Sequence, residues 1–162
     1  MAVDYYLNID GIQGESKDAT HTNYIDIVSF SWGAHQPGTF GQGSGGTAGK
    51  VQMSDFNFTM SSNKATTALL KACATGQHIA KATLYCRKST GNKQDDYMIW
   101  TMQPVIVASY QTGGSSGAEI PVDSVSLNFG KIKIQYKIQT DDKGTLSEGG
   151  SFGWDLEKHA SF

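Results

Sequence analysis

Apolar and polar residues alternate along most of this chain, which is the pattern of half-buried β-strands. The clearest run is Lys131–Ile138, where isoleucines and a tyrosine alternate with lysines and a glutamine. Val125, Leu127 and Phe129 repeat the pattern just before it, and Gly130 between the two runs predicts a bend or a hairpin. The lysines of the later run predict a solvated outer face that also discourages unwanted edge pairing.

Seven further segments alternate in a similar way. They are predicted as the strands Tyr5–Ile9, Ile25–Trp32, Val51–Met60, Ile79–Arg87, Tyr97–Gln103, Val105–Gln111 and Trp154–Glu157. Within Val51–Met60 the apolar positions change parity between Met53 and Phe56. We expect a β-bulge near Ser54 and Asp55, because an extra residue there would restore one inward face.

A single helix is predicted at about Lys64–Thr75, where apolar residues recur at helical spacing. Ser61 or Ser62 is expected to cap its first turn, and Gly76 to end it in the left-handed conformation. One short helix among many strands predicts a mainly β fold: a two-sheet antiparallel β-barrel with one flanking helix. The length of 162 residues predicts a single domain spanning residues 1–162.

Composition narrows the classes of function. The 13 basic and 15 acidic residues give a net charge of -2, which argues against a nucleic-acid binder or a polycationic membrane binder. Aromatic residues make up 10%, which is typical of a folded rather than a disordered chain. No apolar run approaches the roughly 18 residues of a membrane span. The N-terminus also lacks the pattern of a secretory signal.

Glycine is abundant, with 19 residues against 3 prolines, and seven of the glycines lie between Gly33 and Gly49. The segment Gly33–Lys50 has no periodicity and is longer than most loops of compact domains, which favours a function or disorder. Gly41–Gly46 formally matches a dinucleotide-binding glycine motif. Because that motif must open a helix and this one precedes a strand, we interpret the segment as a flexible polar loop without a cofactor.

The residues with reactive or metal-binding side chains do not form a recognisable site. Cys73 and Cys86 are too few for a disulfide framework, so we expect a buried pair of free thiols. No two histidines have the spacing of a structural zinc site, and His78 is expected to bond the carbonyls at the helix end. The four histidines are His21, His35, His78 and His159.

Nothing in the sequence points to catalysis. A nucleophile-elbow motif is absent. The carboxylate pairs Asp95–Asp96 and Asp141–Asp142 fall in polar segments that we interpret as solvated turns with ordinary acids. We therefore expect a binding module or an assembly subunit rather than an enzyme.

Six segments, in this order and spacing, carry a resemblance to a known family. They are Ile12–Asp18, Ser31–Gly33, Asp55–Thr59, Leu69–Ile79, Arg87–Lys88 and Gly153–Asp155. The chain resembles the haemolysin-coregulated protein (Hcp) family of the bacterial type VI secretion system, over nearly its whole length. The resemblance implies a homohexameric ring that stacks into a tube inside a contractile sheath, tipped by a VgrG-like spike protein. It also implies effector proteins carried in the lumen, and no cofactor or metal.

The resemblance also implies roles for particular residues. Ser31 is similar to a lumen-lining position that contacts effectors, although a small strand residue beside Trp32 is an equally simple interpretation. The long loop is expected to contact another ring or subunit, and deletion of residues 38–46 to weaken stacking. Its expected contact residues are Gly38, Gly41, Gly43, Gly45, Gly46 and Gly49.

The expected location is the cytoplasm before firing, followed by export through the type VI apparatus without a cleaved signal peptide. Two alternatives remain: a stand-alone ligand-binding β-barrel module and a subunit of a phage-like tail tube.

Overall fold

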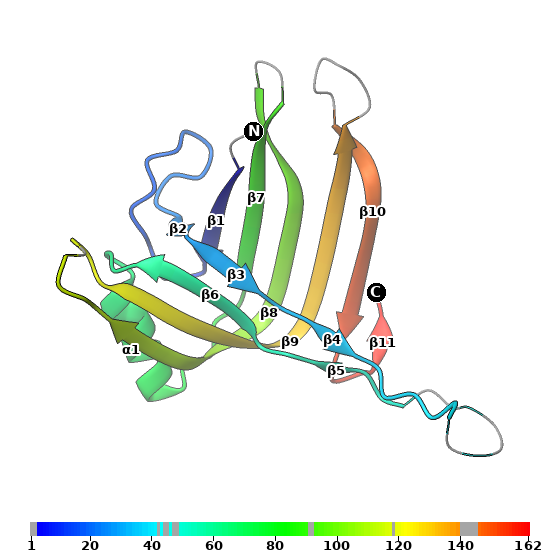
Figure 1. Ribbon diagram of the computed structural model, residues 1–162. Helices are drawn as coiled ribbons and strands as arrows, with labels where there is room; N and C mark the ends of the chain where they lie inside the picture. The colour runs from blue at the N-terminus through cyan, green and yellow to red at the C-terminus, as the bar shows by residue number, and fades with distance from the viewer. Residues whose placement is uncertain are drawn as a thin grey trace.

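The structure is a computed structural model that describes residues 3–41, 43, 46, 49–90, 93–117, 119–139 and 146–162. It is mainly β with one short helix, as predicted (Figure 1). The strands are β1 (Val3–Ile9), β2 (Ile25–Ile27), β3 (Ser29–Ser31), β4 (Ala34–His35), β5 (Gln52–Met53), β6 (Phe56–Ser61), β7 (Ala82–Thr90), β8 (Lys93–Gly113), β9 (Val122–Gln139), β10 (Leu146–Asp155) and β11 (Ala160–Ser161), and the helix is α1 (Thr66–Thr75).

Nine strands form one curved sheet in the order β11-β10-β9-β8-β7-β1-β2, with β6 pairing with β9 and β3 pairing with β6. Every strand pairing between the described residues is antiparallel. The expected barrel is therefore only approximate, because the sheet curves back on itself without closing. The strands β4 and β5 form a separate two-stranded sheet.

The curved sheet has two layers, one containing β1, β7 and β10 and the other containing β3 and β6. Two long strands connect these layers. In Figure 1, β8 and β9 sweep through both layers and bend near their middles. The predicted strands Tyr97–Gln103 and Val105–Gln111 are thus one strand, β8. Gly130 lies within β9, so the bend is confirmed and the hairpin is wrong. A Cβ atom at Gly130 would lie 3.1 Å from Cδ of Pro104, which explains the absence of a side chain at this crowded bend.

Two other predicted strands are divided. Val51–Met60 is not one bulged strand, because Ser54 and Asp55 separate β5 from β6 and the two pair with different partners. The parity change in the sequence thus marks a change of sheet. Ile25–Trp32 divides at Val28, where the chain leaves β1 and begins to pair with β6. Both breaks lie where the chain changes its pairing partner.

The helix packs on β8 through one apolar stripe, with Ala65, Leu69 and Ala72 fully buried. Gly76 adopts the predicted left-handed conformation, with φ of 65°. The predicted serine cap is wrong: the N-cap residue is Ala65, which makes no side-chain cap, and the Ser62 hydroxyl donates to Asp123 at 2.8 Å. The Asp123 carboxylate is buried, and it draws the serine away from the helix end.

The hydrophobic core lies between the two layers. Its largest fully buried side chains come from six of the strands and the helix: Leu7, Ile9, Ile25, Phe56, Phe58, Met60, Leu69, Leu84, Met102, Val105, Leu127 and Ile132. Within the described ranges, no helix has the length and hydrophobicity needed to cross a bilayer.

Candidate functional site: a hydroxyl-lined sheet face

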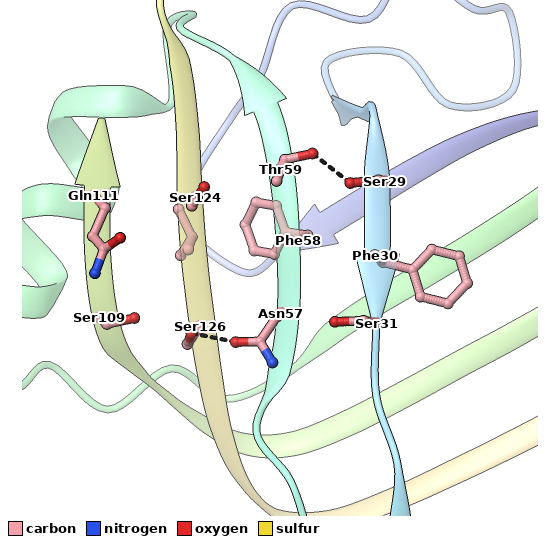
Figure 2. Close-up of a pocket in the computed structure, with 11 residues that line it drawn as sticks. Ser29, Phe30, Ser31, Asn57, Phe58, Thr59, Ser109, Gln111, Ser124 and Ser126 are labelled. Atoms are coloured by element: carbon pink, nitrogen blue, oxygen red, sulfur yellow. Dashed lines mark hydrogen bonds between the residues drawn. The ribbon is translucent and has the colours of Figure 1, made fainter. Parts of the chain in front are cut away.

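One face of the sheet carries eight small or medium-sized polar side chains in two rows across four strands (Figure 2). The first row runs over β3, β6, β9 and β8 through Ser31, Asn57, Ser126 and Ser109. The second row crosses the same strands through Ser29, Thr59, Ser124 and Gln111. We call these eight residues the hydroxyl face.

Strand alternation produces this face. Phe56, Phe58 and Met60 on β6 point into the core and are at most 1% exposed, so Asn57 and Thr59 between them must point outward. Val125 and Leu127 orient β9 in the same way, which brings Ser124 and Ser126 to the outer side. The register then aligns these polar positions from strand to strand.

The face is polar but carries no charge. It borders a shallow hollow of about 380 Å³, and its eight side chains are hydroxyls and amides. Only part of their hydrogen-bonding capacity is used internally: Ser29 and Thr59 share a bond of 2.6 Å, and Ser126 donates to Asn57. Such a surface can bind another polypeptide through hydrogen bonds, but none of its side chains is an acid or base near neutral pH.

The predicted site residues fall in two separate places. Ser31 lies exposed on the hydroxyl face, at its β3 edge. Gly38, Gly41, Gly43, Gly46 and Gly49 lie in the long segment between β4 and β5, while Gly45 lies outside the described residues. The remaining residues of the hydroxyl face were missed in the sequence, although the polar positions between Phe56, Phe58 and Met60 gave a signal for two of them.

The two ends of the long segment pair with each other in the described residues. Ala34 and His35 pair with Met53 and Gln52, and the Gly49 N–H donates to the Pro37 carbonyl at 2.9 Å. In Figure 1, β4, β5 and the segment after β4 lead away from the rest of the sheet. We call residues 33–53 the arm.

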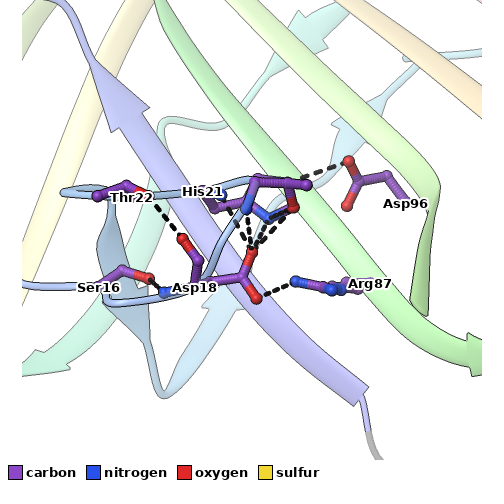
Figure 3. A network of polar contacts seen from close by, with 7 residues as sticks. Ser16, Asp18, His21, Thr22, Arg87 and Asp96 are labelled. Carbon is purple, nitrogen blue, oxygen red and sulfur yellow. Dashed lines mark hydrogen bonds and ion pairs between the residues drawn. The ribbon is translucent and has the colours of Figure 1, made fainter. Parts of the chain in front are cut away.

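A second polar cluster, the charged network, lies at the other end of β8 (Figure 3). The Asp18 carboxylate forms an ion pair with Arg87 and lies 2.9 Å from Nδ1 of His21. Nε2 of His21 lies 3.0 Å from Asp96. The His21 ring is 4% exposed and stacks on Tyr6 with ring centroids 4.7 Å apart.

The ion pair of the charged network shifts the pKa of both Asp18 and Arg87. Burial raises the pKa of Asp18, but hydrogen bonds from Arg87, His21 and Thr20 outweigh burial and hold that pKa well below the usual range. Burial lowers the pKa of Arg87, and the hydrogen bond with Asp18 more than reverses this effect. The bonds therefore stabilise both charges where burial alone would disfavour them.

One interpretation from the sequence is corrected here, and one set of contacts is new. Folding brings Asp18 and Asp96 to the two ring nitrogens of His21, which the sequence did not predict. Asp96 lies within β8 rather than in a solvated turn, whereas Asp141–Asp142 lie outside the described residues. The contact between His21 and Asp96 spans 75 residues of sequence, so local patterns gave no signal for it.

The cysteines and possible metal ligands add no further site. Cys73 and Cys86 are free thiols as predicted, but only Cys86 is buried and Cys73 is partly exposed. Burial and then the charge of Asp96 raise the pKa of Cys86 to about 12, which leaves an unreactive thiol. Among the described residues, no group of three or more His, Cys, Asp or Glu side chains is placed to hold a metal ion.

Comparison with known proteins places this fold. The family described as "Type VI secretion system effector, Hcp" matches residues 6–136. Protein hcp1 of Pseudomonas aeruginosa is 40% identical over 159 residues, which are 98% of each chain. A solved structure of a type six secretion system protein has a TM-score of 0.93 and 29% identity, covering 99% of this chain and 100% of that one.

A crystal structure of Hcp1 from Salmonella typhimurium agrees as well, with a TM-score of 0.81 and 34% identity over 100% of both chains. The resemblance inferred from six short segments is confirmed by these matches over nearly the full length. The chain therefore belongs to the Hcp family, the tube proteins of the type VI secretion system.

Proposed function

We propose that this chain forms the rings of a type VI secretion tube and that the hydroxyl face lines the lumen, where it contacts effector proteins during export. Hcp-family membership supports self-assembly into tube rings. The observation that carries the lumen assignment is the pair of neutral polar rows across β3, β6, β9 and β8. An uncharged face lets diverse polypeptides pass without a strong electrostatic hold.

The two edges of this face suit ring closure. At one edge, β3 pairs only with β6 among the described strands. At the other edge, residues 106–113 of β8 pair only with β9 in the described part of the chain. Unpaired strand edges can extend a sheet into the next copy. A head-to-tail pairing of the β8 edge with the β3 edge would continue the hydroxyl face around a ring.

The first experiment measures assembly. We expect native mass spectrometry to give sixfold the 17.4 kDa of one chain, and negative-stain electron microscopy to show rings. A monomer at micromolar concentration without rings would overturn the tube proposal in favour of a stand-alone binding module. In that case the hydroxyl face would be a ligand surface of a single copy.

The second experiment tests the lumen. Ser31→Gln places a larger side chain in the first row, and we expect it to reduce co-purification of an effector while the rings stay intact. The matched control is Ser116→Gln, which changes an exposed serine in the turn between β8 and β9, outside the hydroxyl face. Equal effector retention in both variants would contradict the assignment of Ser31.

Assembly into a tube would bring this chain into contact with further partners. The ends of the ring stack would contact other rings and the VgrG-like spike, and the outer surface would face the contractile sheath. The proposal assigns no enzymatic activity to this chain, and it locates the protein in the cytoplasm before export without signal cleavage. The intact mass of secreted protein, compared with that of the cytoplasmic form, tests the last point.

A further inference from the structure

An apolar sheet surface continues from the core of this molecule out to solvent. Across β8, β9 and β10, Ile132 pairs with Met102 and Trp154. The next apolar position on β9, Ile134, pairs with Trp100 and Phe152. One row further, Tyr136 lies between Met98 and Gly150. All three rows face the same side, because they are two residues apart on each strand.

Other parts of the chain cover only the first part of this apolar surface. Ile132 is 1% exposed, whereas Tyr136 is 39% and Phe152 is 53% exposed. Phe30 and Trp32 pack against Trp100 with ring centroids 5.8 and 5.4 Å away. The sheet does not close beyond that contact. A hollow remains, which we call the apolar groove, lined by Ile134, Tyr136, Gly150, Ser151 and Phe152.

The groove is an apolar hollow, whereas the arm carries a protruding apolar side chain. Phe40 is 85% exposed, the largest value among the exposed large hydrophobic residues that the structure describes. Its ring lies over Gly46, where any Cβ atom would overlap it. The β4–β5 pairing and the hydrogen bond between Gly49 and Pro37 hold the base of the arm together. The arm is thus built to display Phe40.

The segment around Phe40 and the apolar groove resemble each other in two respects: both present apolar side chains, and neither carries a charge. No Asp, Glu, Lys or Arg occurs from Gln36 to Gly49, and none lines the apolar groove. An uncharged segment around Phe40 in an uncharged groove leaves no ion desolvated without a partner. An aromatic ring is also the kind of anchor that fills apolar pockets at interfaces.

Within one chain, Phe40 does not fill the apolar groove, because its side chain is 85% exposed and is not among the residues that line the groove. In Figure 1 the arm leads away from the sheet, whereas the groove lies on β9 and β10. An apolar group on one part of a molecule and a complementary pocket on another make a head-to-tail contact between copies.

We propose that Phe40 of one copy packs into the apolar groove of an adjacent copy. This contact rests on the proposed ring assembly and names the surface that receives the arm. It joins two different surfaces of identical chains, so each copy gives its arm to one neighbour and receives the arm of another.

Disulfide trapping tests the contact in the assembled protein. In a Cys73→Ala background, Phe40→Cys combined with Phe152→Cys should give a ladder of covalent oligomers after oxidation. The matched control combines Phe40→Cys with Val28→Cys, because Val28 is an exposed apolar residue at 61% outside the groove. We expect about tenfold more crosslinked chains in the first variant than in the control.

Mixing the single variants sharpens the result. Phe40→Cys mixed with Phe152→Cys should stop at crosslinked pairs, because each chain then has one reactive end. Equal crosslinking of the groove and control variants would overturn the proposal. Disulfides formed only between two Phe40→Cys chains, with none to Phe152→Cys, would overturn it as well.

A double-mutant cycle adds a readout without crosslinks. Phe40→Ala and Phe152→Ala should each weaken the rings against dilution, and the double variant should be no weaker than the weaker single variant. Both side chains are exposed, so circular dichroism of the monomers should be unchanged. Rings that form normally while trapping fails would refute only this contact, whereas the absence of rings in the unmodified protein would refute the proposed function.

Discussion

Two polar regions at opposite ends of β8 use their side chains in different ways. The hydroxyl face gathers neutral groups on an open surface and leaves much of their hydrogen-bonding capacity unused. The charged network gathers Asp18, His21 and Arg87 where each is mostly buried, and these groups bond one another. Buried polar groups that bond one another contribute to folding, whereas exposed groups with unused capacity are available to a partner. The comparison thus predicts a role in stability for the charged network, and it supports the binding role that we propose for the hydroxyl face.

The largest expected loss of stability comes from breaking the ion pair between Asp18 and Arg87. Asp18→Asn removes the negative charge and leaves the Arg87 guanidinium, whose side chain is 10% exposed, without its counter-charge. We expect a loss of about 3 kcal/mol in the free energy of unfolding, because an uncompensated buried charge remains. Urea denaturation followed by tryptophan fluorescence measures this loss.

The matched control for this variant is Asp10→Asn, which changes an exposed aspartate at the end of β1. We expect a change within about 0.5 kcal/mol there. If both variants lost the same stability, the charged network would have no special role in folding.

The same ion pair predicts a dependence on pH. The pKa of Asp18 lies below its ordinary 3.8 in the folded protein, so the unfolded chain binds a proton first as the pH falls. The stabilisation is therefore complete above the ordinary pKa and is lost progressively below it. The stability gap between the unmodified protein and Asp18→Asn should shrink from about pH 6 to about pH 3. A gap independent of pH would contradict this account.

The sequence predicted the two regions unequally, for a physical reason. Alternation along β6 is a local signal, and it indicated which side of the strand faces the core. The alignment of Ser31, Asn57, Ser126 and Ser109 depends on strand register, which alternation within single strands does not specify. The family resemblance supplied Ser31 alone, and the rest of its row required the structure.

The long-range contacts of the charged network left no trace in the local sequence. The chain segments that carry Asp18 and Arg87 are 69 residues apart, and the second carboxylate on His21 comes from yet another strand. The misassigned strands have a similar cause: the parity change near Ser54 was visible, but a bulge and a change of sheet give the same pattern. Local patterns therefore predicted the elements better than their partners.

A smaller loss of stability is expected when His21, at the centre of the charged network, is replaced. His21→Leu keeps most of the side-chain volume but removes the contacts with Asp18 and Asp96. We expect a loss of about 2 kcal/mol, because two partly buried carboxylates each lose a hydrogen-bond partner. His78→Leu is the control, since His78 is exposed and should change stability by less than about 0.5 kcal/mol. A stable His21→Leu protein would show that Arg87 alone satisfies the network.

The smallest effect on stability is expected on the hydroxyl face, and it is the one that most clearly separates the two regions. Ser124→Ala removes a hydroxyl that bonds no other side chain in the described part of the chain, so stability should change by less than about 0.5 kcal/mol. Ser126→Ala removes a donor to Asn57 and should cost about 1 kcal/mol at most. Because neither change breaks the fold, rings of both variants can be compared for effector retention by pull-down. Reduced retention with unchanged stability would assign binding to this face, whereas a loss of several kcal/mol in Ser124→Ala would make the face a structural element like the charged network.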